Sequence, residues 1–302
     1  MLRLRRASLG ALTSRTAAKL CSRWFASEAT AATTISQIVV QKHEGGIATV
    51  QMSAGPVNAL SSSMCKDLLT TLKELEDDGA VRGLVLGSSV PGMFSAGLHL
   101  PELLLPVDNS IDALANYWTL VQELWLAFHT TPLATVAALP GHCIAGGLVP
   151  ALACDARVMV NGGKFKLGFN ETAFGLVPPP WLCQLFIEVL GHKRKAEALL
   201  MRGTLVNPET ALELGLVDEL VPLHQLSDAA QAKLEELLRV PDAARRKLKI
   251  QLRQDAAEAL REAQSEDLDA FVSFTAQPEV QRTVASYVES LGSGTKAKKD
   301  EM

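Results

Sequence analysis

The chain has 302 residues, of which 48% are hydrophobic and 21% are charged, so it is long enough to bury a full α/β core with helical segments beside it. Its formal net charge is −4, but residues 1–27 hold six positive and no acidic side chains, which leaves −10 for the remainder. Such an acidic body excludes general electrostatic binding of nucleic acid, and no apolar run approaches the roughly 20 residues of a membrane span.

Residues 1–27 have the composition of a mitochondrial transit peptide. They contain five arginines and several serines without Asp or Glu, and their apolar stretch is too short for a secretory signal. Arg23–Ser27 resembles a matrix processing site, and Glu28 ends the acid-free run. We therefore expect cleavage near residue 25, a mitochondrial-matrix location and ordered structure from about Ser36. A basic tail that binds another partner is the alternative.

The pattern of apolar residues predicts alternating strands and helices after this segment. In chain order we expect a hairpin of strands at 38–41 and 47–52, followed by a helix at 61–79 and a strand at 84–86. A helix at 110–129, a strand at 133–139 and a helix from 146 come next, and two strands follow at 157–160 and 165–167. This alternation indicates parallel pairing with crossover connections, so the core belongs to the α/β class and ligands are expected at the carboxyl ends of the strands.

From about residue 181 onward the chain is predicted to be mainly helical. Apolar residues recur at helical spacing over 181–190, 193–202, 208–214, 225–239, 241–260 and 265–291, with one strand-like stretch at 216–221. This is more apolar helix surface than a small appendage needs for itself, which favours self-assembly. The polar residues 292–302 predict a flexible tail.

Neither the cysteines nor the histidines show the spacing of metal ligands. The five cysteines lack a C-x-x-C pair, and the six histidines are scattered along the chain. We expect no metal site, and we expect the thiols to stay reduced.

Two glycine-containing loops, Phe94–Leu98 and Gly141–Gly147, each follow a predicted buried strand. If the strands are neighbours, the loop amides converge. Gly146 and Gly147 also open a helix, whose positive end favours negative charge, so the loops together can form an oxyanion hole. The second loop lacks the G-x-G spacing and the later acidic residue of a dinucleotide site, which argues against a Rossmann fold.

Four sequence elements together resemble the enoyl-CoA hydratase/isomerase (crotonase) superfamily over about residues 38–222: the Phe-Ser-Ala-Gly-Leu string at 94–98, the glycine loop at 141–147, Cys154-Asp155 and Asn170-Glu171. Longer strings resemble the double-bond isomerases of that superfamily, and they lie at 55–58, 117–118, 121–126 and 168–172.

The resemblance implies an α/β crotonase (ClpP-like) fold of repeated ββα units, with a catalytic core over 36–222 and a C-terminal helical region over 223–291 that forms a homotrimer. It implies an acyl-CoA substrate and no consumed cofactor. The backbone N–H groups of Leu98 and Gly146 would hold the thioester oxygen, and Glu171 would be catalytic. Further substrate contacts are expected at Ala96, Gly97, Gly147, Asn170, Phe174 and Trp181.

The resemblance also bears on the reaction, because members that hydrate a double bond use two carboxylates. One of these positions matches Glu171, but the other matches Val149. A single carboxylate suits the shift of a double bond from 3-enoyl-CoA to 2-trans-enoyl-CoA in the β-oxidation of unsaturated fatty acids, since one base can remove and return the proton. Phe169 and Phe174 beside Glu171 predict an apolar setting that raises its pKa.

Other functions stay open on the sequence alone. The chain could be a hydratase or another acyl-CoA enzyme in which Glu102 or Glu123 supplies the second acid, or a non-catalytic member that binds acyl-CoA or RNA. The acidic body argues against RNA. His99 stands where the superfamily usually has Asp, which is either a local capping change or a contact to the pantetheine.

The targeting hypothesis predicts that residues 1–27, fused to a fluorescent reporter, direct the reporter to mitochondria. The physical basis is the confinement of positive charge without acids to this segment. Imaging against a mitochondrial dye provides the measurement, and a fusion in which the arginines are replaced by glutamine provides the control. A reporter that stays in the cytosol would refute the transit peptide.

Overall fold

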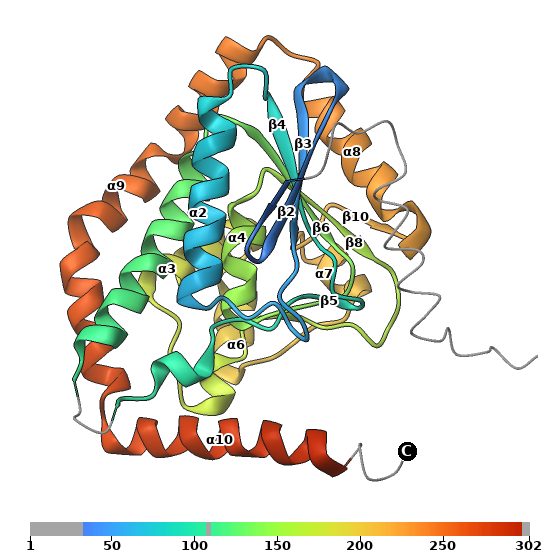
Figure 1. Ribbon diagram of the computed structural model, residues 1–302. Helices are drawn as coiled ribbons and strands as arrows, with labels where there is room; N and C mark the ends of the chain where they lie inside the picture. The colour runs from blue at the N-terminus through green and yellow to red at the C-terminus, as the bar shows by residue number, and fades with distance from the viewer. Residues whose placement is uncertain (1–32, 107–109, 298–302) are drawn as a thin grey trace, which may run out of the picture.

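The computed structural model describes residues 33–106 and 110–297 (Figure 1). The predicted transit peptide at 1–27, with its cleavage near residue 25, lies outside the described residues. The predicted start of structure at Ser36 is too late, because the first described residues, Thr33–Ile35, form a short strand, β1, that pairs antiparallel with the next strand.

Within these residues the main sheet has the strand order β1-β2-β3-β4-β6-β8-β10. The pairs among β1, β2 and β3 are antiparallel, which confirms the predicted hairpin, and the remaining neighbours are parallel. The strands after β1 span Ile38–His43, Ile47–Met52, Gly83–Ser88, Ala134–Leu139, Ala156–Val160 and Glu219–Val221.

A second, small parallel sheet has the order β5-β7-β9, with strands at Met93–Ser95, His142–Ile144 and Leu167–Gly168. The first two were predicted to be loop, and the third was predicted at 165–167. Runs of two or three residues are too short to show a strand period, so only their pairing makes them strands. Since β4, β6 and β8 are each followed by a short strand and then a helix, the predicted ββα repeat is confirmed.

Helices cover both faces of the main sheet (Figure 1). One face packs against α2, α3 and α4, and the other packs against α8. The α-helices are α2 (Ser62–Asp77), α3 (Asp112–Thr130), α4 (Leu148–Ala153), α5 (Pro180–Leu190), α6 (Lys193–Arg202), α7 (Pro208–Glu213), α8 (Leu226–Leu237), α9 (Asp242–Thr275) and α10 (Pro278–Ala297).

Three predicted boundaries in the C-terminal region differ from the structure. The predicted helix over 265–291 is divided, because α9 ends at Thr275 and α10 begins at Pro278, a residue that favours the first position of a helix. The predicted break at 261–264 is absent, because these residues are good helix formers and α9 runs through them to Thr275. The predicted tail at 292–302 is wrong in its first part, since α10 continues to Ala297. Glycine lowers helix propensity by about 1 kcal/mol relative to alanine but does not forbid a helix that is already propagating. Residues 298–302 lie outside the described residues.

Helix α9 is tied to the core by buried charges. The carboxylate of Asp155, just before β8, accepts hydrogen bonds from Lys249 Nζ at 2.9 Å and from Arg253 at 2.8 Å. Burial lowers the pKa of Lys249 to about 8. Removing one partner of such a buried group leaves the other charge uncompensated, so this contact fixes where α9 lies against the sheet and α3.

No helix in the described part of the chain is long and apolar enough to cross a membrane.

Candidate active site

The two glycine loops identified in the sequence lie side by side, because β5 and β7 pair in parallel. Gly97 has a positive φ of 99°, and a Cβ added to it would lie 3.0 Å from the amide nitrogen of Gly146. Likewise, a Cβ added to Gly146 would lie 3.4 Å from the amide nitrogen of Leu98. The structure therefore brings the two predicted oxyanion donors, Leu98 and Gly146, close together.

Both amides are available as donors. Leu98 N donates no hydrogen bond to another group in the described part of the chain. Gly146 lies in a 3-10 turn, Ala145–Gly147, and the leading amides of a helical turn have no partner within it. Ala145, which precedes Gly146, has a positive φ of 51°, a conformation that is uncommon for alanine and is typical of functional loops.

Gly97 and Gly147, both predicted as substrate contacts, line neither of the two pockets described below. Gly147 instead permits close packing, since a Cβ there would lie 2.8 Å from the carbonyl oxygen of Ser95. Gly97 and Gly147 thus contribute to the site by letting the two loops approach each other closely.

Glu171 opens a 3-10 turn, Glu171–Phe174, directly after β9 and Asn170. Burial raises the pKa of its carboxyl to about 7, although the backbone amides of Glu171 and Asn170 act in the opposite direction. Its Oε2 atom is buried and has no hydrogen-bond partner among the described residues. An unpaired carboxyl oxygen in an apolar setting is poised to exchange a proton.

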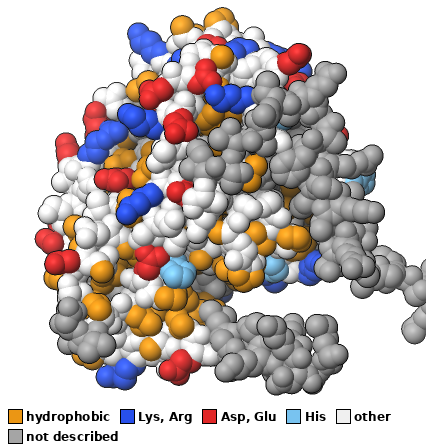
Figure 2. Space-filling view, in the orientation of Figure 1, with side chains coloured by type: hydrophobic (Ala, Val, Ile, Leu, Met, Phe, Trp, Pro, Cys, Tyr) orange, Lys and Arg blue, Asp and Glu red, His pale blue; other side chains and the backbone are white. Residues whose placement is uncertain are grey.

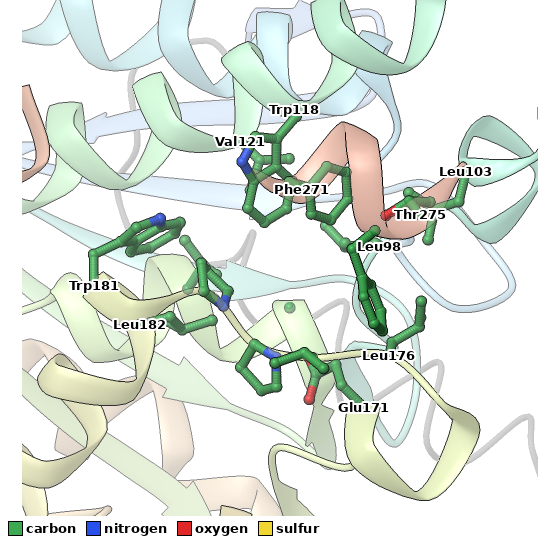
Figure 3. A pocket seen from close by; sticks show the side chains of 16 residues that line it. Leu98, Leu103, Trp118, Val121, Glu171, Leu176, Trp181, Leu182, Phe271 and Thr275 are labelled. Carbon is green, nitrogen blue, oxygen red and sulfur yellow. The ribbon is translucent and has the colours of Figure 1, made fainter. Parts of the chain in front are cut away.

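Glu171 stands where two pockets meet, together with Leu98 and Leu176, which line both. The inner pocket is small, with a volume of about 30 Å³, and almost wholly apolar. Figure 3 shows its aromatic residues Trp118 and Phe271 on one side and the Glu171 carboxyl on the other. Four of the predicted site residues line this pocket, namely Leu98, Gly146, Glu171 and Trp181.

The outer groove has a volume of about 360 Å³ and opens between the loops and α10. The predicted residues Ala96, Asn170 and Phe174 line it, and the Phe174 ring packs 4.2 Å from the ring of Tyr287 on α10. Figure 2 shows hydrophobic side chains gathered above α10, whereas charged side chains are scattered over the upper part of this face.

His99, which departs from the superfamily pattern, also lines the outer groove, and its Nδ1 lies 2.9 Å from Glu102 Oε1. Glu102 additionally accepts a hydrogen bond from the hydroxyl of Ser62 and lines neither pocket. Glu123 lies on α3 beside a different depression of the surface. Among the described residues, Glu171 is thus the only carboxylate lining the inner pocket or the outer groove, and the predicted second position is the buried Val149.

Several pocket residues escaped prediction because they come from distant parts of the chain. Trp118 was predicted only as part of a helix and of a motif at 117–118, yet it lines the inner pocket, and its ring stacks 3.6 Å from that of Phe271 on α9. Phe271 and Phe274 follow the last recognised motif by about a hundred residues, and no local pattern distinguishes them from ordinary apolar helix positions.

Among the described residues, no group of three or more His, Cys, Asp or Glu side chains could hold a metal ion.

The chain is similar to known proteins over most of its length. A family model described as Enoyl-CoA hydratase/isomerase matches residues 42–295. The chain is 37% identical over 256 residues to "Enoyl-CoA delta isomerase 1, mitochondrial" of Rattus norvegicus, covering 84% of this chain and 87% of the relative. It is 36% identical over 256 residues to the Homo sapiens protein of the same name, covering 84% and 83%.

Among solved structures, the chain is similar to the crystal structure of human mitochondrial delta3-delta2-enoyl-CoA isomerase. The TM-score is 0.82 at 36% identity, and the match covers 85% of this chain and 99% of that one. The expected crotonase fold is thereby confirmed.

The raised pKa of Glu171 predicts a pH-dependent stability. The folded protein holds this proton up to about pH 7, whereas an unfolded glutamate releases it near pH 4.5. Because the folded state binds more protons between these values, the free energy of unfolding falls as the pH rises from 4.5 to about 7. In urea unfolding, the wild type should lose on the order of 3 kcal/mol of unfolding free energy over this pH range through Glu171, and Glu171→Gln should not show this loss.

The control for this measurement is Glu123→Gln, which changes a glutamate outside both pockets and should follow the wild-type profile. If Glu171→Gln and the wild type lose the same stability over this pH range, the carboxyl is not desolvated.

Proposed function

Because the chain belongs to the enoyl-CoA hydratase/isomerase family, we propose that it is an isomerase that converts 3-enoyl-CoA to 2-trans-enoyl-CoA in the β-oxidation of unsaturated fatty acids. The observation that carries the proposal is the position of Glu171, a buried carboxyl with an unpaired Oε2 atom at the junction of an apolar pocket and an open groove. The names of the rat and human relatives support the same reaction class.

The proposed mechanism begins with the thioester oxygen held by the amides of Leu98 and Gly146. Glu171 removes a proton from C2, and the electrons of the C2–H bond form a dienolate whose negative charge lies on that oxygen. Fixed amides stabilise this charge without reorganising. Glu171 then returns the proton to C4, the double bond forms between C2 and C3, and the carboxylate is regenerated. No cofactor is consumed.

The environment of Glu171 suits both halves of this transfer. A pKa of about 7 makes the carboxylate a stronger base than an exposed glutamate, while its protonated form remains a good acid near neutral pH. The apolar inner pocket also limits access of water to the proton in transit. Hydration is less well supported, since Val149 occupies the position of the second carboxylate and adds no acid to the pocket.

We further propose that the protein works as a homotrimer in the mitochondrial matrix. The side chains of Leu248 and Leu252, one turn apart on α9, are 55% and 75% exposed. Exposed apolar side chains on a helix of this kind fit an interface between copies of the chain. Multi-angle light scattering of the protein without residues 1–27 should give the mass of three copies, and replacing both leucines with lysine should lower that mass. A monomer at micromolar concentration would exclude the trimer.

The mechanism predicts that Glu171→Gln lowers the isomerisation rate by about 10²–10⁴-fold, because the amide keeps the shape of the side chain but cannot accept a proton. The rise in ultraviolet absorbance of the conjugated product measures the rate, without added cofactor. For the wild type, kcat/KM should increase as the pH rises through about 7, since the base must be deprotonated. Near-normal turnover by Glu171→Gln, with Glu123→Gln as the matched control, would remove Glu171 from the mechanism.

A further inference from the structure

We propose that Trp181 is a gate that sets the acyl-chain length of the substrate. In this arrangement it closes the far end of the inner pocket and separates that pocket from a larger groove between α5 and α9. The proposal rests on the isomerase function proposed above, because it assigns the inner pocket to the acyl chain beyond C4.

The position of Trp181 between two spaces is the first observation. Its side chain, in the first turn of α5, lines both the inner pocket and a groove of about 540 Å³. Figure 3 shows Trp181 and Leu182 at one end of the inner pocket, away from Leu103 and Leu176 at the other. A chain that enters past Glu171 and moves away from Leu176 therefore meets the indole of Trp181.

The small size of the inner pocket is the second observation. Its volume is about 30 Å³, against about 540 Å³ for the groove behind Trp181. With the thioester oxygen at Leu98 and Gly146 and C2 to C4 beside Glu171, the proposal assigns this small space to the first carbons beyond C4. A twelve-carbon 3-enoyl chain then needs space beyond Trp181, whereas a six-carbon chain does not.

The groove behind Trp181 offers that space. Its walls are largely apolar and come mostly from α5 and α9, with Leu185 on α5 and with Leu260 and four alanines on α9. An extended hydrocarbon tail can lie along such a surface and be removed from water there.

A single carboxylate holds the gate closed. Asp267 Oδ2 accepts hydrogen bonds from Gln122 at 2.7 Å, from the Trp118 indole at 2.9 Å and from the Trp181 indole at 3.2 Å. Asp267 also lines the groove, so it stands beside the path that would open. The bond to Trp181 is the longest of the three, and Trp181 is less buried than Trp118. Asp267 is thus a positioning residue that acts through the indole.

The test compares kcat/KM for 3-hexenoyl-CoA and 3-dodecenoyl-CoA in the wild type and in Trp181→Leu. The wild type should prefer the six-carbon substrate, and Trp181→Leu should raise the ratio of twelve-carbon to six-carbon kcat/KM by about tenfold or more. Phe128→Leu is the control, because Phe128 is a buried aromatic residue of α3 that lines neither the inner pocket nor the groove. It should keep the wild-type ratio. An unchanged ratio in Trp181→Leu, or an equal change in Phe128→Leu, would overturn the gate.

Asp267 variants test the positioning role separately. Asp267→Ala frees the indole and should shift the ratio in the same direction as Trp181→Leu, whereas Asp267→Asn keeps an oxygen acceptor and should retain the preference for the short chain. A general loss of rate with both substrates, without a change in the ratio, would show that Asp267 is merely structural. If Trp181→Leu does not fold by circular dichroism, Trp181→Phe provides the smaller ring and should shift the ratio in the same direction.

The two proposals fail in different ways. If neither substrate is isomerised by the wild type, the proposed function is wrong. If both are isomerised but the variants leave the ratio unchanged, the function stands and the gate is wrong.

Discussion

The candidate site depends on the close approach of two backbone loops where β5 and β7 pair. A Cβ added to Gly141 would lie 2.0 Å from the carbonyl oxygen of Gly92, and one added to Gly147 would lie 2.8 Å from that of Ser95. Only glycine fits at such distances, so the absence of side chains here is a steric requirement. The two amides of Leu98 and Gly146 are held by this packing before any ligand arrives, which is the condition for electrostatic stabilisation without reorganisation.

The second requirement is an apolar environment for Glu171, and the C-terminal helices supply part of it. Helix α9 contributes Phe271 and Phe274 to the inner pocket, and α10 contributes Tyr287 to the outer groove. The buried ion pairs of Asp155 with Lys249 and Arg253 hold the first half of α9 against the core. Residues about a hundred positions later therefore contribute to the burial that raises the pKa of Glu171. Packing of the helical region and the chemistry of the core are physically coupled.

The same apolar walls serve binding and catalysis in the proposed reaction. Hydrophobic contacts remove the acyl tail from water, and the exclusion of water keeps Glu171 desolvated. In the proposed reaction the thioester lies where the two spaces meet, beside the Glu171 carboxyl and the amides of Leu98 and Gly146. At the far end of the inner pocket, one carboxylate oxygen of Asp267 accepts hydrogen bonds from two indole rings, Trp118 on α3 and Trp181 on α5, and so orients both.

The sequence by itself determined the α/β class, the hairpin, the long strands and most helix positions, because hydrophobic period and turn residues act locally. It also predicted Glu171, Leu98 and Gly146 as site residues, since these lie in short motifs that resemble the superfamily, and the structure brings all three to the lining of one pocket. The tertiary structure decided what depends on distant contacts. The strands of the small sheet exist only through pairing, Trp118 is part of a pocket only because Phe271 lies against it, and Asp267 gains a role only where three side chains converge on it. Such contacts join residues up to 153 positions apart, as Trp118 and Phe271 are, and no local pattern records them.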